Sequence, residues 1–353
     1  MKRKEIRPLL GGAAVLALLL TGCSGEDTAG EDAAGSADSM TYVGYGGVVQ
    51  DAAYEQWLQP FAEATGAEVL QDSPLDFAKL TSMVESGRTV WDLINSEPFF
   101  PIQECGDLVQ ELQLENVDVG KLPEGTVYDC TVPIYGYAVM LAYNADTYGD
   151  EPPASYADFF DLERFPGTRL APASAVSGPL EVALLADGVD PDELYPLDID
   201  RALAKWDTIR GNVNFWQTGA ESQQALESGS ADMAIVWSGR IAEAELNGAN
   251  VEPVWAQNLF AWAALSVPTG APGAELAFKA IEDVLTPETQ ERLAESMAYS
   301  PVNSDARPDL NPTYAKLNVA SPEAEAQRVT QDAQWIADNQ QELVEAWSNW
   351  MLG

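Results

Sequence analysis

The sequence predicts an α/β protein with two halves, each built on a mainly parallel β-sheet flanked by helices. Strand-like and helix-like apolar runs alternate along most of the chain, and this alternation is typical of parallel strands joined by right-handed crossovers. Residues 40–353 of the 353-residue chain form a segment longer than a single domain usually is, and its length is typical of two domains. No low-complexity linker interrupts them, so we expect strands to join the halves.

The first half opens with a β-α-β-α-β pattern. Between Tyr54 and Phe61, four large apolar residues recur at i, i+3, i+4 and i+7, which predicts a helix over 51–65. Gly66 is expected to end this helix. The other elements expected here are strands at 40–45, 68–71 and 90–95 and a helix at 76–86.

The alternation resumes after residue 167 and supplies the second half and the C-terminal helices. Short β-branched and aromatic runs predict its strands, and longer runs of helical period predict its helices. The expected strands are 168–171, 213–216, 232–237 and 262–267. The expected helices are 179–186, 198–210, 222–228, 241–246, 274–285, 287–296 and a long one near 323–350.

The N-terminal residues predict export. Four basic residues within positions 2–7 precede an apolar run from Leu9 to Leu20, which is too short to remain as a membrane-spanning helix. The following Leu20-Thr21-Gly22-Cys23 resembles the bacterial lipobox. The resemblance implies a signal peptide over 1–22, a lipidated Cys23 and anchoring to the outer face of the cell membrane. The alternative is an ordinary signal peptide followed by a chance cysteine.

Residues 23–39 are expected to form a flexible tether behind this anchor. Positions 24–39 consist of small, polar and acidic residues and include no aromatic residue, Leu, Ile or Val. Such a segment cannot bury enough apolar surface to offset the entropy of ordering it.

The charge of the chain restricts its partners. Lys and Arg number 18 against 56 Asp and Glu, a formal net charge of −38. This sign excludes nucleic acid and electrostatic docking on anionic lipid. A dispersed acidic surface is typical of proteins from salty habitats, and the alternative is a field that concentrates cationic solutes.

Cysteine and histidine content bears on stability and chemistry. Cys105 and Cys130 are an even pair in an exported chain, so we predict a disulfide that closes a 25-residue loop and contributes about 3 kcal/mol. The chain has no histidine, which excludes Ser-His-Asp and Cys-His catalysis and His-containing zinc sites. No constellation of acids singles out a hydrolytic pair. We therefore expect no enzyme, no metal and no cofactor.

Five segments carry a recognisable order of strand ends and turns. They are Tyr42-Val-Gly-Tyr-Gly-Gly47, Trp91-Asp-Leu-Ile-Asn-Ser96, the strand 132–144 that ends in Tyr-Asn, Asp232-Met-Ala-Ile-Val-Trp-Ser-Gly239 and Tyr299-Ser-Pro-Val-Asn303. In this order and spacing the chain resembles the extracellular solute-binding proteins of bacterial ABC importers, in particular the spermidine/putrescine-binding group.

The resemblance implies a two-lobed, type II-like periplasmic-binding-protein fold with the ligand cleft between the lobes. One lobe would take 40–139 plus 262–306, and the other 140–261 plus 307–353. Ligand would bind at the carboxyl ends of the strands, and hinge bending would close the lobes over it. The expected protein is a monomer that captures a small polar solute and delivers it to the transmembrane permease subunits.

The resemblance also implies which residues meet the ligand. Aromatic walls are their common feature, because a Trp or Tyr face attracts an ammonium group. The expected ligand-binding residues are Tyr45, Gly46, Ser96, Tyr135, Tyr137, Ser177, Glu181, Trp237, Arg240 and Trp262.

Two departures bear on the ligand. The loop 171–178 carries no acid and Ala263 stands where an acid is expected, so two carboxylates of polyamine binders are missing. Arg240, expected in the first turn of a helix capped by Ser238, suits a carboxylate. We therefore expect an amine-containing solute, either a zwitterion such as 4-aminobutyrate or a polyamine. The alternative ligands are thiamine and a small anionic solute, and the alternative function is that of a non-transport lipoprotein of this fold. For Arg240, the alternative is an ion pair with a nearby Glu.

Overall fold

The computed structural model describes residues 38–353. The predicted signal peptide, the predicted lipidation site Cys23 and nearly all of the predicted tether lie outside the described residues. Within the described part, no helix is both long and apolar enough to cross a membrane.

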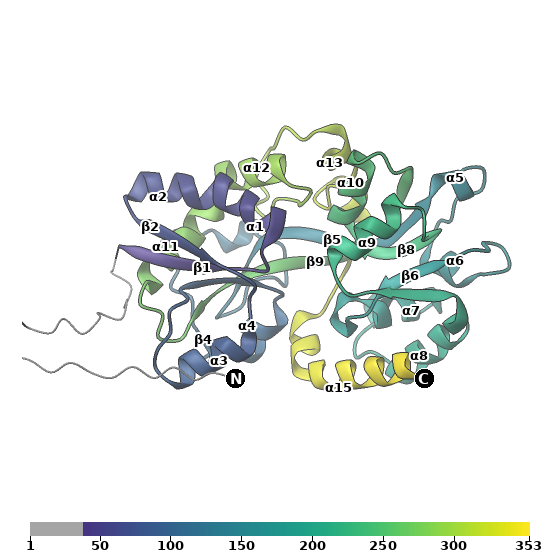
Figure 1. Cartoon of the computed structure of the whole chain (residues 1–353), viewed down its shortest axis with the longest axis horizontal. Helices are drawn as coiled ribbons and strands as arrows, with labels where there is room; N and C mark the ends of the chain where they lie inside the picture. The colour runs from purple at the N-terminus through teal and green to yellow at the C-terminus, as the bar shows by residue number, and fades with distance from the viewer. Residues whose placement is uncertain (1–37) are drawn as a thin grey trace, which may run out of the picture. The chain divides into compact units, whose positions relative to one another are not determined.

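The central feature of the described residues is a mixed sheet in the order β2-β1-β3-β9-β5-β8-β6-β7. Three parallel strands lie at each end of it, and two long antiparallel strands, β5 and β9, run through its middle (Figure 1). The bounds are β1 Ser39–Val43, β2 Glu68–Asp72, β3 Leu93–Ser96, β5 Val132–Asn144, β6 Arg169–Pro172, β7 Val213–Trp216, β8 Met233–Trp237 and β9 Val251–Pro268. Short strands β4 (Val109–Gln110) and β10 (Val329–Thr330) pair with β9. The predicted α/β fold is confirmed, and strands do join its halves.

Helices cover the first three parallel strands much as predicted. The predicted helix 51–65 begins earlier and consists of α1 (Gly47–Ala53), a π-helical turn and α2 (Gln59–Thr65), and Gly66 ends it at φ 75°. This left-handed conformation suits glycine. The other helices on this side are α3 (Phe77–Glu85), α4 (Phe99–Gln103), α11 (Ala274–Val284) and α12 (Pro287–Ser296).

The second group of helices contains one correction. The long helix expected near 323–350 is α14 (Pro322–Ala326), then β10, then α15 (Ala333–Leu352). It is interrupted because Val329 and Thr330 pair with β9, and Asp332, which accepts from the Trp335 amide, then caps a new helix. The remaining helices are α5 (Ala145–Tyr148), α6 (Tyr156–Phe160), α7 (Pro179–Ala186), α8 (Ile199–Asp207), α9 (Gly219–Glu227), α10 (Ser238–Leu246) and α13 (Pro312–Lys316).

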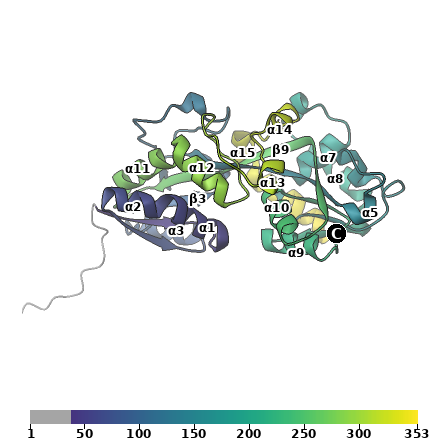
Figure 2. The ribbon, with the colours of Figure 1, turned by 90° about the horizontal axis from the view of Figure 1, so that it is seen from above.

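The two large hydrophobic cores lie at opposite ends of β5 and β9. The first contains Trp57 and Phe61 from the predicted helix face, with β1, β3, α11 and α12. The second contains Trp206 and Trp347, with α7, α8 and α15. Figure 2 shows the two groups of helices on either side of the crossing strands. Burial of an aromatic side chain contributes about 1.5–3 kcal/mol, so each half carries its own stabilising core.

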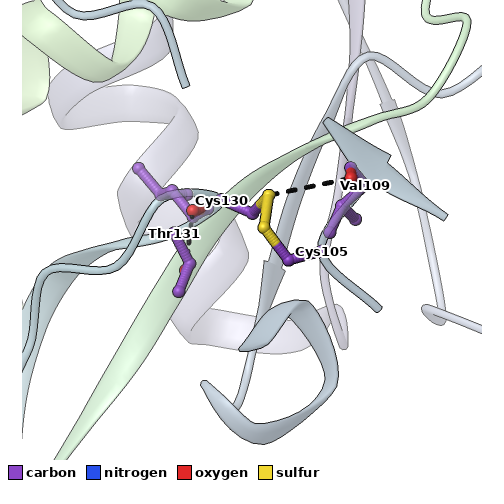
Figure 3. Close-up of a disulfide and its surroundings, with 5 residues drawn as sticks. Cys105, Val109, Cys130 and Thr131 are labelled. Carbon is purple, nitrogen blue, oxygen red and sulfur yellow. Dashed lines mark hydrogen bonds between the residues drawn. A yellow bond between two sulfur atoms is a disulfide. The ribbon is translucent and has the colours of Figure 1, made fainter. Parts of the chain in front are cut away.

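The predicted disulfide is present (Figure 3). Cys105 and Cys130 are bonded, with their Cα atoms 5.5 Å apart. The bond joins the segment after α4 to the residues that lead into β5, on the side of the first core.

Candidate functional site

A cleft of about 770 Å³ opens between the two groups of elements. One wall comes from the β1–α1 loop and the end of β3, the other from the starts of α9 and α10, and β5 forms part of the floor. The β1–α1 loop and the end of β3 stand on the first core, whereas α9 and α10 stand on the second. The lining residues include Tyr42, Tyr45, Gly46, Val48, Val49, Gln50, Asn95, Ser96, Glu97, Tyr135, Tyr137, Gln217, Thr218, Gly219, Gln223, Trp237, Arg240, Ala263 and Tyr299.

The structure brings seven of the ten expected ligand-binding residues together in this cleft. They are Tyr45, Gly46, Ser96, Tyr135, Tyr137, Trp237 and Arg240. They come from β1–α1, β3, β5 and β8–α10, segments up to about two hundred positions apart in the sequence.

Two further expected residues, Ser177 and Trp262, line a small recess of about 20 Å³. The recess shares Glu97, Tyr137 and Trp237 with the cleft, so the two spaces adjoin. Its volume is close to that of a single water or ammonium group. Apart from Glu97, Ser177 and Gln331, its walls are mainly apolar and aromatic.

Glu181 does not lie in the lining of either space, and this expectation is corrected. It is 1% exposed within α7, and its Oε1 accepts from the Tyr195 hydroxyl at 2.9 Å and the Gln331 amide at 3.0 Å. Burial raises the pKa of Glu181 above its usual value, against the smaller opposing effect of these hydrogen bonds. Gln331, not Glu181, reaches the recess.

Glu97 places a carboxylate in the cleft, although it was not among the expected ligand-binding residues. It follows Ser96, the last residue of β3, and lines both the cleft and the recess. The Tyr45 hydroxyl donates a hydrogen bond to its Oε2. The signal that could have found it was position: it is the first residue after a strand whose end was already expected in the pocket.

Aromatic rings connect the two walls. Tyr137 lies edge-on to Trp237 at 6.1 Å and to Tyr299 at 5.9 Å between ring centroids, and Tyr299 packs on Tyr135 at 4.5 Å. Burial, followed by the charge of Glu97, raises the pKa of Tyr137 well above its usual value, so its hydroxyl stays neutral. Tyr299 was not among the expected ligand-binding residues.

Arg240 lies in the first turn of α10, as predicted, but Ser238 is not the cap. Ser238 is the first helical residue, and its Oγ accepts from the Ala138 amide at 3.1 Å. The Arg240 Nη1 donates to Gln223 Oε1 at 3.3 Å, and its buried Nε has no hydrogen-bond partner among the described residues. No ion pair within 4.0 Å among residues 38–353 includes Arg240, which removes the alternative of a pairing with Glu.

Gly219 makes room for this guanidinium. A Cβ atom at Gly219 would lie 2.5 Å from the Arg240 Nε and 3.0 Å from the Trp237 ring. Such contacts are far inside van der Waals distance, so the absence of a side chain lets Arg240 lie against the first turn of α9.

The cleft between two α/β lobes joined by crossing strands defines a two-lobed solute-binding protein. The chain belongs to the bacterial extracellular solute-binding protein family, whose model matches residues 56–322. It is the solute-capturing component of an ABC importer and acts outside the cytoplasm, where it passes a small solute to the permease.

Two relatives and two solved structures are informative. A γ-aminobutyric acid-binding protein of Pseudomonas aeruginosa is 31% identical over 88% of this chain and 90% of its own length. A spermidine/putrescine-binding periplasmic protein of Escherichia coli is 23% identical over 76% and 80%. A solved structure named Atu4243-GABA receptor has a TM-score of 0.83 at 36% identity, and the match covers 89% of this chain and 97% of that one. A periplasmic binding protein of A. tumefaciens in complex with glucopine has a TM-score of 0.79 at 28% identity, covering 89% and 99%.

Proposed function

We propose that the solute is a zwitterion with a terminal ammonium and a carboxylate, such as 4-aminobutyrate. The observation that carries the proposal is the placement of opposite charges on opposite walls of one cleft. Glu97 follows β3 on one wall and Arg240 begins α10 on the other. The names of two relatives, one a curated protein and one a solved structure, point to the same ligand class.

The ammonium end would lie at Glu97, where the cleft meets the recess. A carboxylate there makes a charge-assisted hydrogen bond with an ammonium. The Tyr137 and Trp237 rings add cation–π attraction of about 0.5–2 kcal/mol each. The recess beside them is of ammonium size and bounded by Trp262.

The carboxylate end would lie at Arg240. A guanidinium binds a carboxylate through two parallel hydrogen bonds, and no carboxylate within residues 38–353 forms an ion pair with Arg240. The amino-terminal ends of α9 and α10 converge here and add a favourable dipole.

A zwitterion of this kind would also drive closure. We propose lobes of 40–139 plus 262–306 and 140–261 plus 307–353, so that Glu97 belongs to one and Arg240 to the other. A ligand held at both ends gains its full binding free energy only when the walls approach, and this differential affinity favours the closed form.

A polyamine fits the charges less well. A diamine with one end at Glu97 would place its second ammonium near the Arg240 guanidinium, and repulsion between these like charges opposes binding. 4-Aminobutyrate, putrescine and butyrate share a four-carbon chain and differ only in their charged end groups. Comparing their affinities therefore measures the contribution of each end of the ligand separately.

The test is calorimetric titration of the purified full chain with these three compounds. Binding of 4-aminobutyrate about 100-fold or more tighter than either putrescine or butyrate supports the proposal, because each analogue lacks one charged contact worth about 1.5–3 kcal/mol and putrescine also adds repulsion. Putrescine binding as tightly as 4-aminobutyrate would contradict it.

We further propose that Cys23 carries the lipid anchor on the outer face of the cell membrane, that the protein is a monomer, and that it has no catalytic activity. The lipobox resemblance supports the anchor, and the absence of histidine supports the lack of His-dependent catalysis. Release of the Cys23→Ala variant from the membrane fraction tests the anchor. An unchanged ligand after overnight incubation tests the lack of catalysis.

A further inference from the structure

A second space opens beside Arg240, away from Glu97. This side chamber of about 190 Å³ is bounded by Val48 and Val49 of α1, Arg240 and Glu243 of α10, Met297 after α12, and Tyr314 of α13. It shares Val48, Val49, Arg240 and Tyr299 with the cleft, so it is an extension of the ligand space. The proposed 4-aminobutyrate has no group that would enter it.

The charged group that this chamber adds is the carboxylate of Glu243. Its hydrogen-bond partner is the Tyr314 hydroxyl, at a long 3.4 Å, and no ion pair within 4.0 Å among residues 38–353 includes it. Its neighbour Glu245 differs, because Lys316 pairs with Glu245 at 2.9 Å. The Glu243 side chain is partly buried and has no ion-pair partner among residues 38–353, so its carboxylate can accept a charge-assisted hydrogen bond from a cation outside the chain.

Glu243 and Arg240 are three residues apart on α10, and both line the chamber. Side chains at this spacing are neighbours on one helix face, with Cβ atoms about 5–6 Å apart. None of the ion pairs among residues 38–353 joins Arg240 to Glu243 within 4.0 Å. A cation beside an anion at this separation matches the head group of an α-amino acid, whose carboxylate and ammonium are attached to one carbon.

The Tyr299 hydroxyl links this pair to the rest of the site. Burial raises the pKa of Tyr299, the Arg240 charge lowers it, and the charges of Glu243 and Glu97 raise it. The charges of Arg240, Glu243 and Glu97 therefore all act on this one hydroxyl. Tyr299 and Arg240 line both the cleft and the side chamber, so Glu243 borders the same ligand space as the groups assigned to 4-aminobutyrate.

We propose that the side chamber is a subsite for an α-ammonium group, so that the preferred solute is an α,ω-diamino acid. Its ω-ammonium binds at Glu97, its carboxylate at Arg240 and its α-ammonium at Glu243. L-2,4-Diaminobutyrate is the matched probe, because it is 4-aminobutyrate with an ammonium on the carbon next to the carboxylate. The inference rests on the proposed function and names the solute class more narrowly.

The experiment compares L-2,4-diaminobutyrate with 4-aminobutyrate by calorimetric titration of the purified full chain at one ionic strength. We expect the diamino acid to bind about tenfold tighter or more, the gain typical of one charge-assisted hydrogen bond. The Glu243→Gln variant should reverse the order. It loses the α-ammonium contact, and removal of a negative charge beside Arg240 strengthens binding of the 4-aminobutyrate carboxylate.

The Glu342→Gln variant is the matched control, because it removes the same charge from an exposed position on α15. It should leave both affinities unchanged. Equal or weaker binding of the diamino acid by the unaltered protein, with 4-aminobutyrate still bound, overturns the subsite and leaves the proposed function standing. Failure of both compounds to bind overturns both proposals. An unchanged preference in Glu243→Gln, at an unchanged unfolding midpoint, also overturns the subsite.

Discussion

The two walls of the cleft hold their charges in different ways. On the first wall, Glu97 already accepts a hydrogen bond from Tyr45 of the neighbouring loop. On the second wall, Arg240 has one long hydrogen bond to Gln223 and a buried Nε with no hydrogen-bond partner in the described part of the chain. The first charge is partly satisfied by the protein, whereas the second has unused donors. An unused charge-assisted donor costs free energy until a ligand accepts from it, so the second wall should dominate affinity.

The largest expected effect is on the second wall. Arg240→Ala should weaken 4-aminobutyrate binding about 100-fold or more, because a bidentate contact between charged groups is lost. Titration calorimetry measures the change, and Arg164→Ala, at an exposed ion pair, is the control. Unchanged affinity in Arg240→Ala would show that the guanidinium does not meet the solute.

A smaller effect is expected on the first wall. Glu97→Gln removes the charge but keeps an oxygen that can accept from Tyr45 and from an ammonium, so 4-aminobutyrate should bind about 30-fold weaker. The exposed Glu85→Gln is the control for the loss of one negative charge. If Glu97→Gln weakened binding more than Arg240→Ala, the ranking of the two walls would be reversed.

The next substitution changes the second wall but replaces no charged residue. Gly219→Ala introduces a Cβ that would lie 2.5 Å from the Arg240 Nε, so the guanidinium must shift. We expect about tenfold weaker binding, since a misplaced bidentate partner retains only part of its contact. At Gly211 no described residue other than its chain neighbours lies within 4 Å of an added Cβ, and Gly211→Ala should bind normally. Equal affinities in the two variants would contradict the role given to Gly219.

The smallest effect concerns the hydrogen bond on the first wall. Tyr45→Phe removes the donor to Glu97 and should change 4-aminobutyrate affinity by only about threefold, because the freed carboxylate can still bind the ammonium. Tyr54→Phe, on the α1–α2 helical segment outside the lining, serves as the comparison. A loss as large as that of Glu97→Gln would mean that Tyr45 contacts the solute directly.

Local patterns in the sequence account for most of the regular structure. The strand 213–216 and the helices 179–186 and 287–296 have the bounds that were predicted. Arg240 falls in the first turn of its helix, and Cys105 is bonded to Cys130. Helical and strand periods involve neighbours within a few residues, and an even pair of cysteines in an exported chain has one pairing available. These features therefore need little knowledge of distant contacts.

Only the tertiary structure decided which acids line the cleft. Glu181 turns inward, because Gln331, 150 positions away in sequence, donates to it. Glu97 faces the cleft, because β3 ends beside the β1–α1 loop that carries Tyr45. The break of the C-terminal helix at β10 depends likewise on pairing of Val329 and Thr330 with β9. A single residue's direction follows from such long-range contacts, whereas the alternation of strands and helices follows from the spacing of apolar residues along the chain.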